Sequence, residues 1–595
     1  MKVRYFKRTG GVIGLTIILG AMTTASINAF ADDVTDRVTA RHPVAGVLSA
    51  DGDELWIANR RGGSVTRLDL ERLEVVDEYR IAREPTDLQR FGDELLITDF
   101  ASHELVGFQV TDETPKVRFR VPVAKYPMRV VVDETRRRGW ITSLWSRRLT
   151  IVDLKTDPPA VVKTIDLPFA PESQTLLDQN TLVVADAFGG RIAIVDCEKL
   201  QVRAIHEIPA HNITDLVVDD GRLWMTHQIL TDTAHTTAQN IRWGVLMTNA
   251  VRSLVVADWT DPKTDILENS RLTRLGGDIG GGASDPEALA RHGDDWLVCL
   301  GGIDKLAICS SDWNAVQRLP VGSRPVDVLV DPKRNRAMVL NQLSDSVSVI
   351  DLGEQIDLDE PTVTATIPLG PERKLSAKDR GERLFHSGRL SHQGWLSCQS
   401  CHPKGHTNNG LADTLGDGAY GDPKRVLSLG GVADTNDWAW NGSVRELTEQ
   451  MRKSVETTMR GGSINPATAG DLATYLFTLD FAPSLIDARG LRTDSEIQNQ
   501  IEKGRQVFQS QGCATCHVPS FTYTTDGTFD VGLQDTVGNR KFSPPSLRGV
   551  SQRDLFLHDG RAKSLEEVFS TWHHQLDAPL NPENLRNLVT FLQSL

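Results

Sequence analysis

The chain has 595 residues, of which 65 are basic and 79 acidic, giving a formal net charge of -14. Its length predicts several domains, and 39% hydrophobic with 24% charged residues indicates a globular protein, not a disordered or collagen-like one. The acidic balance argues against a general nucleic-acid binder, and seven cysteines in so long a chain exclude a disulfide-rich scaffold.

The N-terminus has the pattern of an export signal. Its basic segment contains Lys2, Arg4, Lys7 and Arg8. An apolar stretch from Gly11 to Met22 follows, which is too short to span a bilayer comfortably, and then the small-residue pattern Ala29-Phe30-Ala31. This predicts a signal peptide at residues 1–31, cleaved after Ala31, and a periplasmic protein that does not span the membrane. An uncleaved membrane anchor is the alternative.

Residues 42–370 are repetitive. Segments such as GDELWIANRRGGSVTRLDL and RNRAMVLNQLSDSVSVIDL share short apolar strands separated by Gly, Asp or Asn turns. Seven units begin at Pro43, Pro85, Pro127, Pro171, about Thr214, Pro286 and Pro325. A period of roughly 40–45 residues is typical of one four-stranded propeller blade. The pattern predicts an all-β, seven-bladed propeller whose fifth blade has an insertion at about 229–284.

The repeat resembles the YVTN-type bacterial β-propellers, which indicates a fold and not a function. We expect the propeller to be a scaffold or docking surface without a cofactor. Cys299 and Cys309 lie on successive predicted strands, where they either form a cross-strand disulfide or remain free.

Two identical C-x-x-C-H motifs follow the propeller. Their members are Cys398, Cys401 and His402, and Cys513, Cys516 and His517. Two thiols at this spacing can bond to the vinyl groups of one haem, whose iron the adjacent histidine then binds. The motifs predict two covalently bound haem c groups. Zinc knuckles and thioredoxin-like redox pairs are the alternatives, but zinc requires four clustered ligands and a redox pair does not need the histidine.

The two haem segments are internal copies. Ser428 and Ser546 are 118 positions apart, as are Gly442 and Gly560, and the haem motifs themselves are 115 apart. This predicts two mostly α-helical cytochrome c domains produced by duplication, at 376–485 and 490–595.

The segments RGERLFHSGRLSHQGWLSCQSCH, WNGSVRELTEQMRKSVETTM and FSPPSLRGVSQRDLFLHDGRAKSLEEVF resemble the bacterial dihaem cytochrome c peroxidases and the related MauG-type enzymes. The resemblance covers nearly all of 376–595. It implies that the first haem reacts with hydrogen peroxide and that the second receives electrons from a small donor protein, a cytochrome c or a cupredoxin. A MauG-type enzyme would instead oxidise residues of a partner protein, and the propeller could dock such a partner.

Two residue roles come from this resemblance. Trp440, before Asn441-Gly442, corresponds to a tryptophan between the haems; a packing aromatic is the alternative. Glu456 corresponds to a glutamate that faces the reactive haem, where a carboxylate can take a proton from peroxide and return it to the leaving oxygen. A surface helix glutamate is the alternative.

The chain also departs from the family pattern. The loop at Gly416-Asp417-Gly418 lacks the distal histidine of peroxidases that need reductive activation, which predicts an open sixth position at the first haem. Met459 is the rival ligand there, and His406 a weaker one. Arg425 and Arg553 lie near places where calcium ligands would be expected, so calcium is doubtful and a guanidinium could supply the charge instead.

The sixth ligand of the second haem cannot be methionine, because none follows Met459. The internal repeat places His574 where Glu456 lies in the first copy. Direct family alignment instead places Trp572 at the ligand position, and because tryptophan cannot ligate iron, the adjacent His573 is the alternative. His558, Tyr523 and an open site remain further alternatives.

The sequence is therefore compatible with two classes of function. The first is an oxidoreductase that reduces peroxide or uses it to oxidise a partner. The second is a non-catalytic dihaem electron carrier that docks to a redox partner through its propeller.

Overall fold

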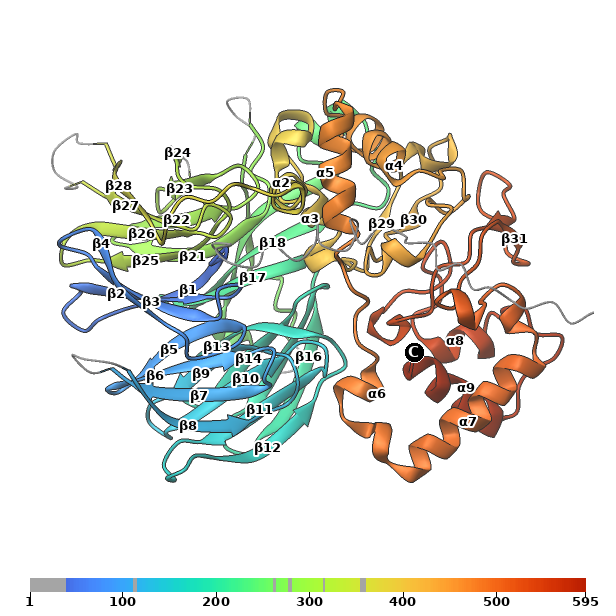
Figure 1. Cartoon of the computed structure of the whole chain (residues 1–595), viewed down its shortest axis with the longest axis horizontal. Helices are drawn as coiled ribbons and strands as arrows, with labels where there is room; N and C mark the ends of the chain where they lie inside the picture. Colours follow the sequence, from blue (N-terminus) through green and yellow to red (C-terminus); the bar gives the residue numbers. More distant parts are fainter. Residues whose placement is uncertain (1–38, 111–114, 260–263, 277–280, 314–315, 354–359) are drawn as a thin grey trace, which may run out of the picture. The chain divides into compact units, whose positions relative to one another are not determined.

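The computed structural model describes residues 39–595 except 111–114, 260–263, 277–280, 314–315 and 354–359. Ala40–Leu595 form one compact unit (Figure 1). The predicted signal peptide lies outside the described residues. Within them, no helix has both the length and the apolar character needed to cross a membrane.

The first part of this unit is a seven-bladed β-propeller, as the repeat predicts. The first four sheets are β1 Pro43–Leu48, β2 Glu54–Asn59, β3 Ser64–Asp69, β4 Glu74–Tyr79; β5 Pro85–Phe91, β6 Glu94–Asp99, β7 Glu104–Gln109, β8 Lys116–Pro122; β9 Pro127–Asp133, β10 Arg138–Ser143, β11 Arg148–Asp153, β12 Ala160–Asp166; and β13 Pro171–Asp178, β14 Thr181–Asp186, β15 Arg191–Asp196, β16 Gln201–Glu207. The other three are β17 His211–Asp219, β18 Arg222–Leu230, β19 Met247–Val255, β20 Arg271–Arg274; β21 Pro286–His292, β22 Asp295–Leu300, β23 Lys305–Cys309, β24 Val316–Pro320; and β25 Pro325–Asp331, β26 Arg336–Asn341, β27 Ser346–Asp351, β28 Thr362–Pro368.

Burial explains the composition of the strands. The second strand of a blade is apolar and wholly buried, as in β14 with the sequence TLVVAD. The fourth strand is mostly exposed, as in β12 with AVVKTID. Middle strands are covered by neighbouring blades on both faces, whereas the outer strand borders solvent and can carry polar side chains.

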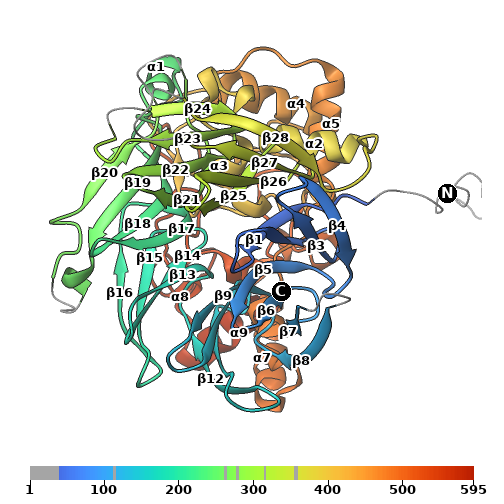
Figure 2. The ribbon, with the colours of Figure 1, turned by 90° about the vertical axis from the view of Figure 1, so that its left-hand side faces the viewer.

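The ring closes by contact between β1 and β25, and Figure 2 shows the blades around their common axis. Buried carboxylates of innermost strands link neighbouring blades. Asp87 accepts a hydrogen bond from the Val130 amide at 2.8 Å, and Asp327 accepts one from the Gly46 amide at 2.9 Å. Because the second bond joins the last blade to the first, polar contacts as well as packing close the ring.

The insertion in the fifth blade is smaller than predicted. The span 229–284 contains β19 and β20, the third and fourth strands of that blade. The additional residues form the end of a long hairpin, in which β18 and β19 pair as far as Leu230 and Met247 and helix α1 (Ala238–Arg242) occupies the turn.

Cys299 and Cys309 are both free. In the register of β22 and β23, Cys299 lies opposite Leu306 and Cys309 lies opposite Trp296. Alternate residues of a strand point to opposite faces, so the two thiols belong to different hydrophobic clusters on either side of the blade. Strand register therefore rules out the disulfide.

The C-terminal part is mostly helical, as predicted. Its helices are α2 Ala377–Phe385, α3 Cys398–Cys401, α4 Leu447–Lys453, α5 Pro466–Leu476, α6 Leu485–Ala488, α7 Ser495–Ser510, α8 Leu565–Ser570 and α9 Pro582–Gln593. Two short hairpins accompany them, β29 Leu411–Ala412 with β30 Lys424–Arg425, and β31 Phe529–Asp530 with β32 Lys541–Phe542.

The helical part contains the same helix pair twice. Helix α2 packs on α5, and α7 packs on α9. A Cβ added at Gly381 of α2 would lie 2.0 Å from the carbonyl oxygen of Asp471, and one at Gly504 of α7 would lie 2.0 Å from that of Asn587. Glycine lets each pair of backbones approach closely, and the same device in both pairs is what the internal repeat predicts.

Candidate haem sites

The first C-x-x-C-H motif lines a cavity of about 330 Å³. Cys398 and Cys401 are the two ends of α3, and His402 follows directly. All three side chains contribute to the cavity wall. Helical backbone at the motif brings the two thiols and the imidazole to one side of the chain, as attachment of a single haem requires.

The protonation states suit this chemistry. Burial raises the pKa of Cys398 and Cys401 to about 12, so both remain thiols. Burial lowers the pKa of His402 to about 4, so its imidazole is neutral at pH 7, the form that binds a metal. Zinc coordination would need thiolates, and among the described residues no group of three or more His, Cys, Asp or Glu side chains is arranged to hold a metal ion.

Two buried arginines line the same cavity. Arg425 Nη1 and Arg553 Nε have no hydrogen-bond partner among the described residues. Burial lowers the pKa of Arg425 to about 9 and that of Arg553 to about 10. A buried cation without a counter-charge is unfavourable. An anionic group in the cavity would compensate both, and the carboxylates of a haem fit this requirement, so the residues present are compatible with haem c.

One wall of the cavity is a π-helical turn at Ser454–Thr458, which directly follows α4. Val455 and Met459 line the cavity, and both are buried. Glu456 does not line it and is half-buried. A π-helical turn shifts side-chain directions within a helix and is frequent at functional sites. The structure thus brings the rival Met459, but not Glu456, to the cavity.

The predicted alternative ligand His406 points elsewhere. Its Nε2 lies 3.1 Å from the Gln552 carbonyl oxygen and its Nδ1 lies 3.1 Å from Ser428 Oγ. Both ring nitrogens are therefore occupied by hydrogen bonds.

The second motif lies on a 3-10 turn, Cys513–Thr515. His517 Nδ1 donates a hydrogen bond to the Tyr523 carbonyl at 3.0 Å, which leaves Nε2 free to bind a metal. Burial lowers the pKa of His517 to about 4; the Tyr523 carbonyl acts in the opposite direction, and the nearby His574 lowers it further.

The two candidate sixth ligands of this site differ in their surroundings. His574 is close enough to His517 to affect its pKa, and its buried Nδ1 has no partner among the described residues. His573 is exposed, and its Nδ1 donates to the Phe569 carbonyl at 3.1 Å.

An aromatic series leads from the first cavity toward the second repeat. Trp440 lines the cavity, and its Nε1 donates to the Arg425 carbonyl at 2.9 Å. Its ring centroid is 6.5 Å from that of Phe542, which stacks on His558 at 4.2 Å. Trp440 thus lies at the boundary between the repeats, and His558 is part of this stack.

The blade-five hairpin covers part of the first site. His235 Nε2 lies 3.2 Å from Asp413 Oδ2, and its ring stacks on Tyr420 at 4.6 Å. Arg460 Nε donates to the Thr236 carbonyl at 2.7 Å. Because Arg460 directly follows Met459, the propeller hairpin supports the wall formed by the π-helical turn.

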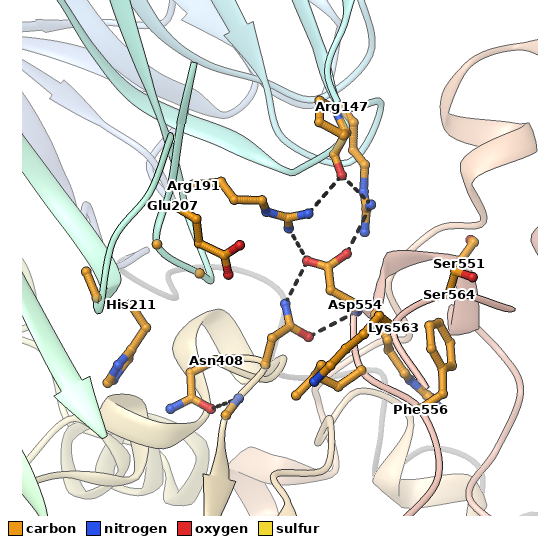
Figure 3. A pocket seen from close by; sticks show the side chains of 18 of the residues that line it. Arg147, Arg191, Glu207, His211, Asn408, Ser551, Asp554, Phe556, Lys563 and Ser564 are labelled. Carbon is orange, nitrogen blue, oxygen red and sulfur yellow. Dashed lines mark hydrogen bonds and ion pairs between the residues drawn. The ribbon is translucent and has the colours of Figure 1, made fainter. Parts of the chain in front are cut away.

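A larger cavity, of about 680 Å³, lies between blades four and five and both haem repeats. Figure 3 shows Arg147 and Arg191 of the propeller converging on Asp554 of the second repeat. The Arg147 Nη1–Asp554 Oδ1 distance is 3.3 Å, and Arg191 also pairs with Asp554. Asn409 Nδ2 of the first repeat donates to Asp554 Oδ2 at 3.1 Å, so one carboxylate connects all three regions.

Residues 377–475 match the family model of di-haem cytochrome c peroxidase. The chain is 28% identical over 284 residues to the methylamine utilization protein MauG of Methylorubrum extorquens, covering 38% of this chain and 79% of that protein. The C-terminal part of the chain is thus similar to the di-haem cytochrome c peroxidases. A cytochrome c551 peroxidase of Nitrosomonas europaea is 24% identical over 310 residues, 43% of this chain and 92% of that protein.

Among solved structures, hydrazine synthase of Kuenenia stuttgartiensis aligns with a TM-score of 0.47 and 17% identity, over 55% of this chain and 99% of that one. In this chain, the segment that matches the peroxidase family model follows the seven propeller sheets.

Sequence reasoning missed the propeller loop residues that contact the C-terminal part, such as Arg147 and Arg191. Nothing in the blade repeat distinguishes them, because equivalent loop positions in other blades also carry polar residues. Only the positions of the folded loops show which of them reach the haem repeats.

Proposed function

We propose that the protein is an exported, periplasmic dihaem c-type cytochrome that reduces hydrogen peroxide or uses it to oxidise a partner. The pattern at residues 1–31 supports export. Similarity to MauG and to cytochrome c551 peroxidase supports an oxidoreductase that acts on peroxide. A small donor protein, a cytochrome c or a cupredoxin, would supply electrons to the second repeat for use at the first.

The groups that would hold the cofactors are the six motif residues, Cys398, Cys401, His402, Cys513, Cys516 and His517. Haem c, when bound there, supplies a redox-active iron at each motif. His574 is our proposed sixth ligand in the second repeat, with His573 as its rival. Arg425 and Arg553 would neutralise the carboxylates of the haem in the first cavity, and in our proposal they make calcium unnecessary there.

Glu456 is proposed to move the proton. Reduction of peroxide to water needs a proton on the leaving oxygen, and a carboxylate can accept the proton from the near oxygen and deliver it there. Glu456 follows Val455, which lines the cavity, but Glu456 itself does not line it, so this role requires the carboxylate to move toward bound peroxide. Trp440 would provide the aromatic contact through which the repeats exchange electrons.

The observation that carries the proposal is the first cavity itself. It combines the complete C-x-x-C-H triad with two buried, uncompensated arginines and a wall on a π-helical turn. These features would hold a haem at the first motif, where the proposal places the peroxide reaction.

The position of Met459 supports the second candidate function, a non-catalytic electron carrier. A buried methionine in the cavity wall is available to occupy the sixth position of the first haem. The carrier would then dock to a redox partner through its propeller.

The test is the ferric EPR spectrum of the holoprotein with and without hydrogen peroxide, together with the rate of peroxide consumption. A peroxide-reactive site predicts a high-spin first haem that changes on addition of peroxide. A low-spin first haem that becomes high-spin only in Met459→Leu would establish the carrier instead.

Glu456→Gln should reduce the rate of peroxide reaction by roughly 10²–10⁴, the usual effect of general acid–base catalysis, with both haems still attached. The control is Glu449→Gln, an exposed glutamate of the preceding helix that pairs with Arg452 at 3.1 Å. An unchanged rate in Glu456→Gln would remove that residue from the mechanism.

A further inference from the structure

The haem-attachment helix of the first repeat is bound by a carboxylate of the propeller. Ser397 Oγ donates to Asp285 Oδ2 at 2.5 Å, and Ser400 Oγ donates to Asp285 Oδ1 at 2.6 Å. Ser397 precedes Cys398 and Ser400 precedes Cys401, and the side chains of both serines are buried. Each oxygen of one carboxylate thus holds the residue before one haem cysteine.

Asp285 is itself fixed within the propeller. It directly precedes Pro286, the start of β21, and has a φ of 54°. Its carbonyl accepts from the Gly301 amide at 2.9 Å, and its Oδ1 also accepts from Gln228 Nε2 at 3.2 Å. A carboxylate with this many partners and a constrained backbone has little freedom to move.

Two neighbouring propeller residues complete the contact. His211 Nε2 and Asn212 Nδ2 both donate to the Ser400 carbonyl, each at 3.1 Å. This carbonyl belongs to the last turn of α3, where helix carbonyls lack partners within the helix. Propeller residues therefore provide hydrogen-bond partners both for the two serine hydroxyls and for a carbonyl at the C-terminal end of α3.

The same position in other blades also contacts the first repeat. His42 precedes Pro43 and lies 3.9 Å from Glu382, and Arg324 precedes Pro325 and lies 2.8 Å from His386 Nε2. Asp285 is thus one of a set of loop residues on this face, and its carboxylate binds both serines of the haem motif.

The second motif has no such support. Gly512 and Thr515 stand where the first motif has Ser397 and Ser400. Both are exposed, and among the described residues no hydrogen bond connects residues 512–517 to the propeller. The second repeat therefore serves as an internal reference in which the haem motif lacks the propeller contact.

We propose that Asp285 is a positioning residue for the first haem, through which the propeller fixes the attachment helix and thereby the orientation of His402. The inference depends on the proposed function only in that the first motif carries haem. Asp285 does not touch the reacting atoms; it acts through Ser397, Ser400 and α3. The propeller is then part of the first haem site and not only a platform for other proteins.

The test uses Asp285→Asn in the full holoprotein, with redox titration and ferric EPR of both haems. The side-chain amide of this variant presents an NH₂ donor to one of the two serine hydroxyls, where the carboxylate presented an acceptor, and it carries no negative charge. Helix α3 should therefore lose one of its two hydrogen bonds to residue 285. We expect the reduction potential of the first haem to rise by roughly 59 mV, which for one electron corresponds to a tenfold change in its redox equilibrium. Its EPR signal should also broaden, while the second haem stays unchanged.

Two further variants complete the experiment. Asp327→Asn removes a comparable buried carboxylate that links blades without contacting the haem repeat, and it should leave both potentials unchanged. Ser400→Ala removes the contact from the other side while leaving the carboxylate in place, and it should broaden the EPR signal of the first haem and add little broadening to that of Asp285→Asn.

Equal shifts at both haems, or a shift in Asp327→Asn as large as in Asp285→Asn, would overturn the proposal. An unchanged first haem in Ser400→Ala would also overturn it, even if Asp285→Asn does not fold. Neither readout involves peroxide, so a protein with these shifts but no peroxide reaction would refute the proposed function and leave this inference intact.

Discussion

The two haem repeats share one backbone design but have different surroundings. Trp438 and Val444 form an isolated β-bridge in the first repeat, and Phe556 and Ala562 form the matching bridge 118 positions later. In the first repeat, however, Ser397 and Ser400 are buried against propeller loops, whereas the matching Gly512 and Thr515 are exposed. Duplication preserved the backbone contacts, and the differences lie in what covers each motif.

The repeats also differ opposite the motif histidine. Near the first cavity the chain places Glu456 and Met459 on a π-helical turn, whereas near the second motif it places His574. An imidazole with a buried, unpartnered nitrogen suits a ligand that closes a coordination site. A cavity with no such imidazole leaves room for a small reactant. This difference supports our proposal of electron transfer at the second repeat and peroxide chemistry at the first.

The largest expected effect comes from removing the proposed imidazole ligand that distinguishes the second site from the first. His574→Gly should convert the second haem completely from low-spin to high-spin, because the proposed ligand is removed, and should leave the first haem unchanged. Ferric EPR measures both haems in one sample. His573→Gly is the matched control and should change neither. If only His573→Gly alters the spin state, the family alignment identifies the ligand; if neither does, the ligand lies elsewhere.

A smaller effect tests the close helix packing that the two repeats share. Gly381→Ala and Gly504→Ala should each destabilise its own repeat by about 1–3 kcal/mol, because a methyl group overpacks a helix crossing. Calorimetric melting temperatures of the holoprotein measure this effect.

The control for the helix crossing is Gly470→Ala in α5, where a Cβ would have nothing within 4 Å. It should stabilise the protein by up to about 1 kcal/mol through helix propensity. A clearly smaller loss in one of the two crossing variants than in the other would show that the packing is not equivalent.

The smallest effect concerns the boundary between the repeats. Trp440→Phe should slow electron transfer between the haems by less than about tenfold, because phenylalanine keeps an aromatic ring but loses the hydrogen bond to the Arg425 carbonyl. Stopped-flow reduction of the second haem, followed by oxidation with peroxide, measures the rate. Trp438→Phe, a neighbouring tryptophan of the same cavity, is the control. An equal or larger effect of that control would place the electron path elsewhere.

Local patterns were sufficient for much of the architecture. Inner strands begin at Pro43, Pro85, Pro127, Pro171, Pro286 and Pro325, as predicted, because proline lacks the amide that the interior of a sheet requires. The boundaries of the fifth blade were less clear, since its hairpin extends regular pairing beyond the repeat. The sequence left open whether Cys299 and Cys309 form a disulfide, because strand register, which decides the face of each side chain, depends on exact turn geometry.

The sequence by itself determined the chemistry that depends on neighbouring residues: two C-x-x-C-H motifs, their duplication, and the lack of a methionine after Met459. Only the tertiary structure decided which distant groups meet these motifs. Asp285 lies more than a hundred positions before Ser397 and reaches it because closure of the ring turns that loop toward α3. Likewise, a π-helical turn directs Met459 into the cavity and Glu456 away from its wall, and such a turn depends on the packing around it more than on local propensity.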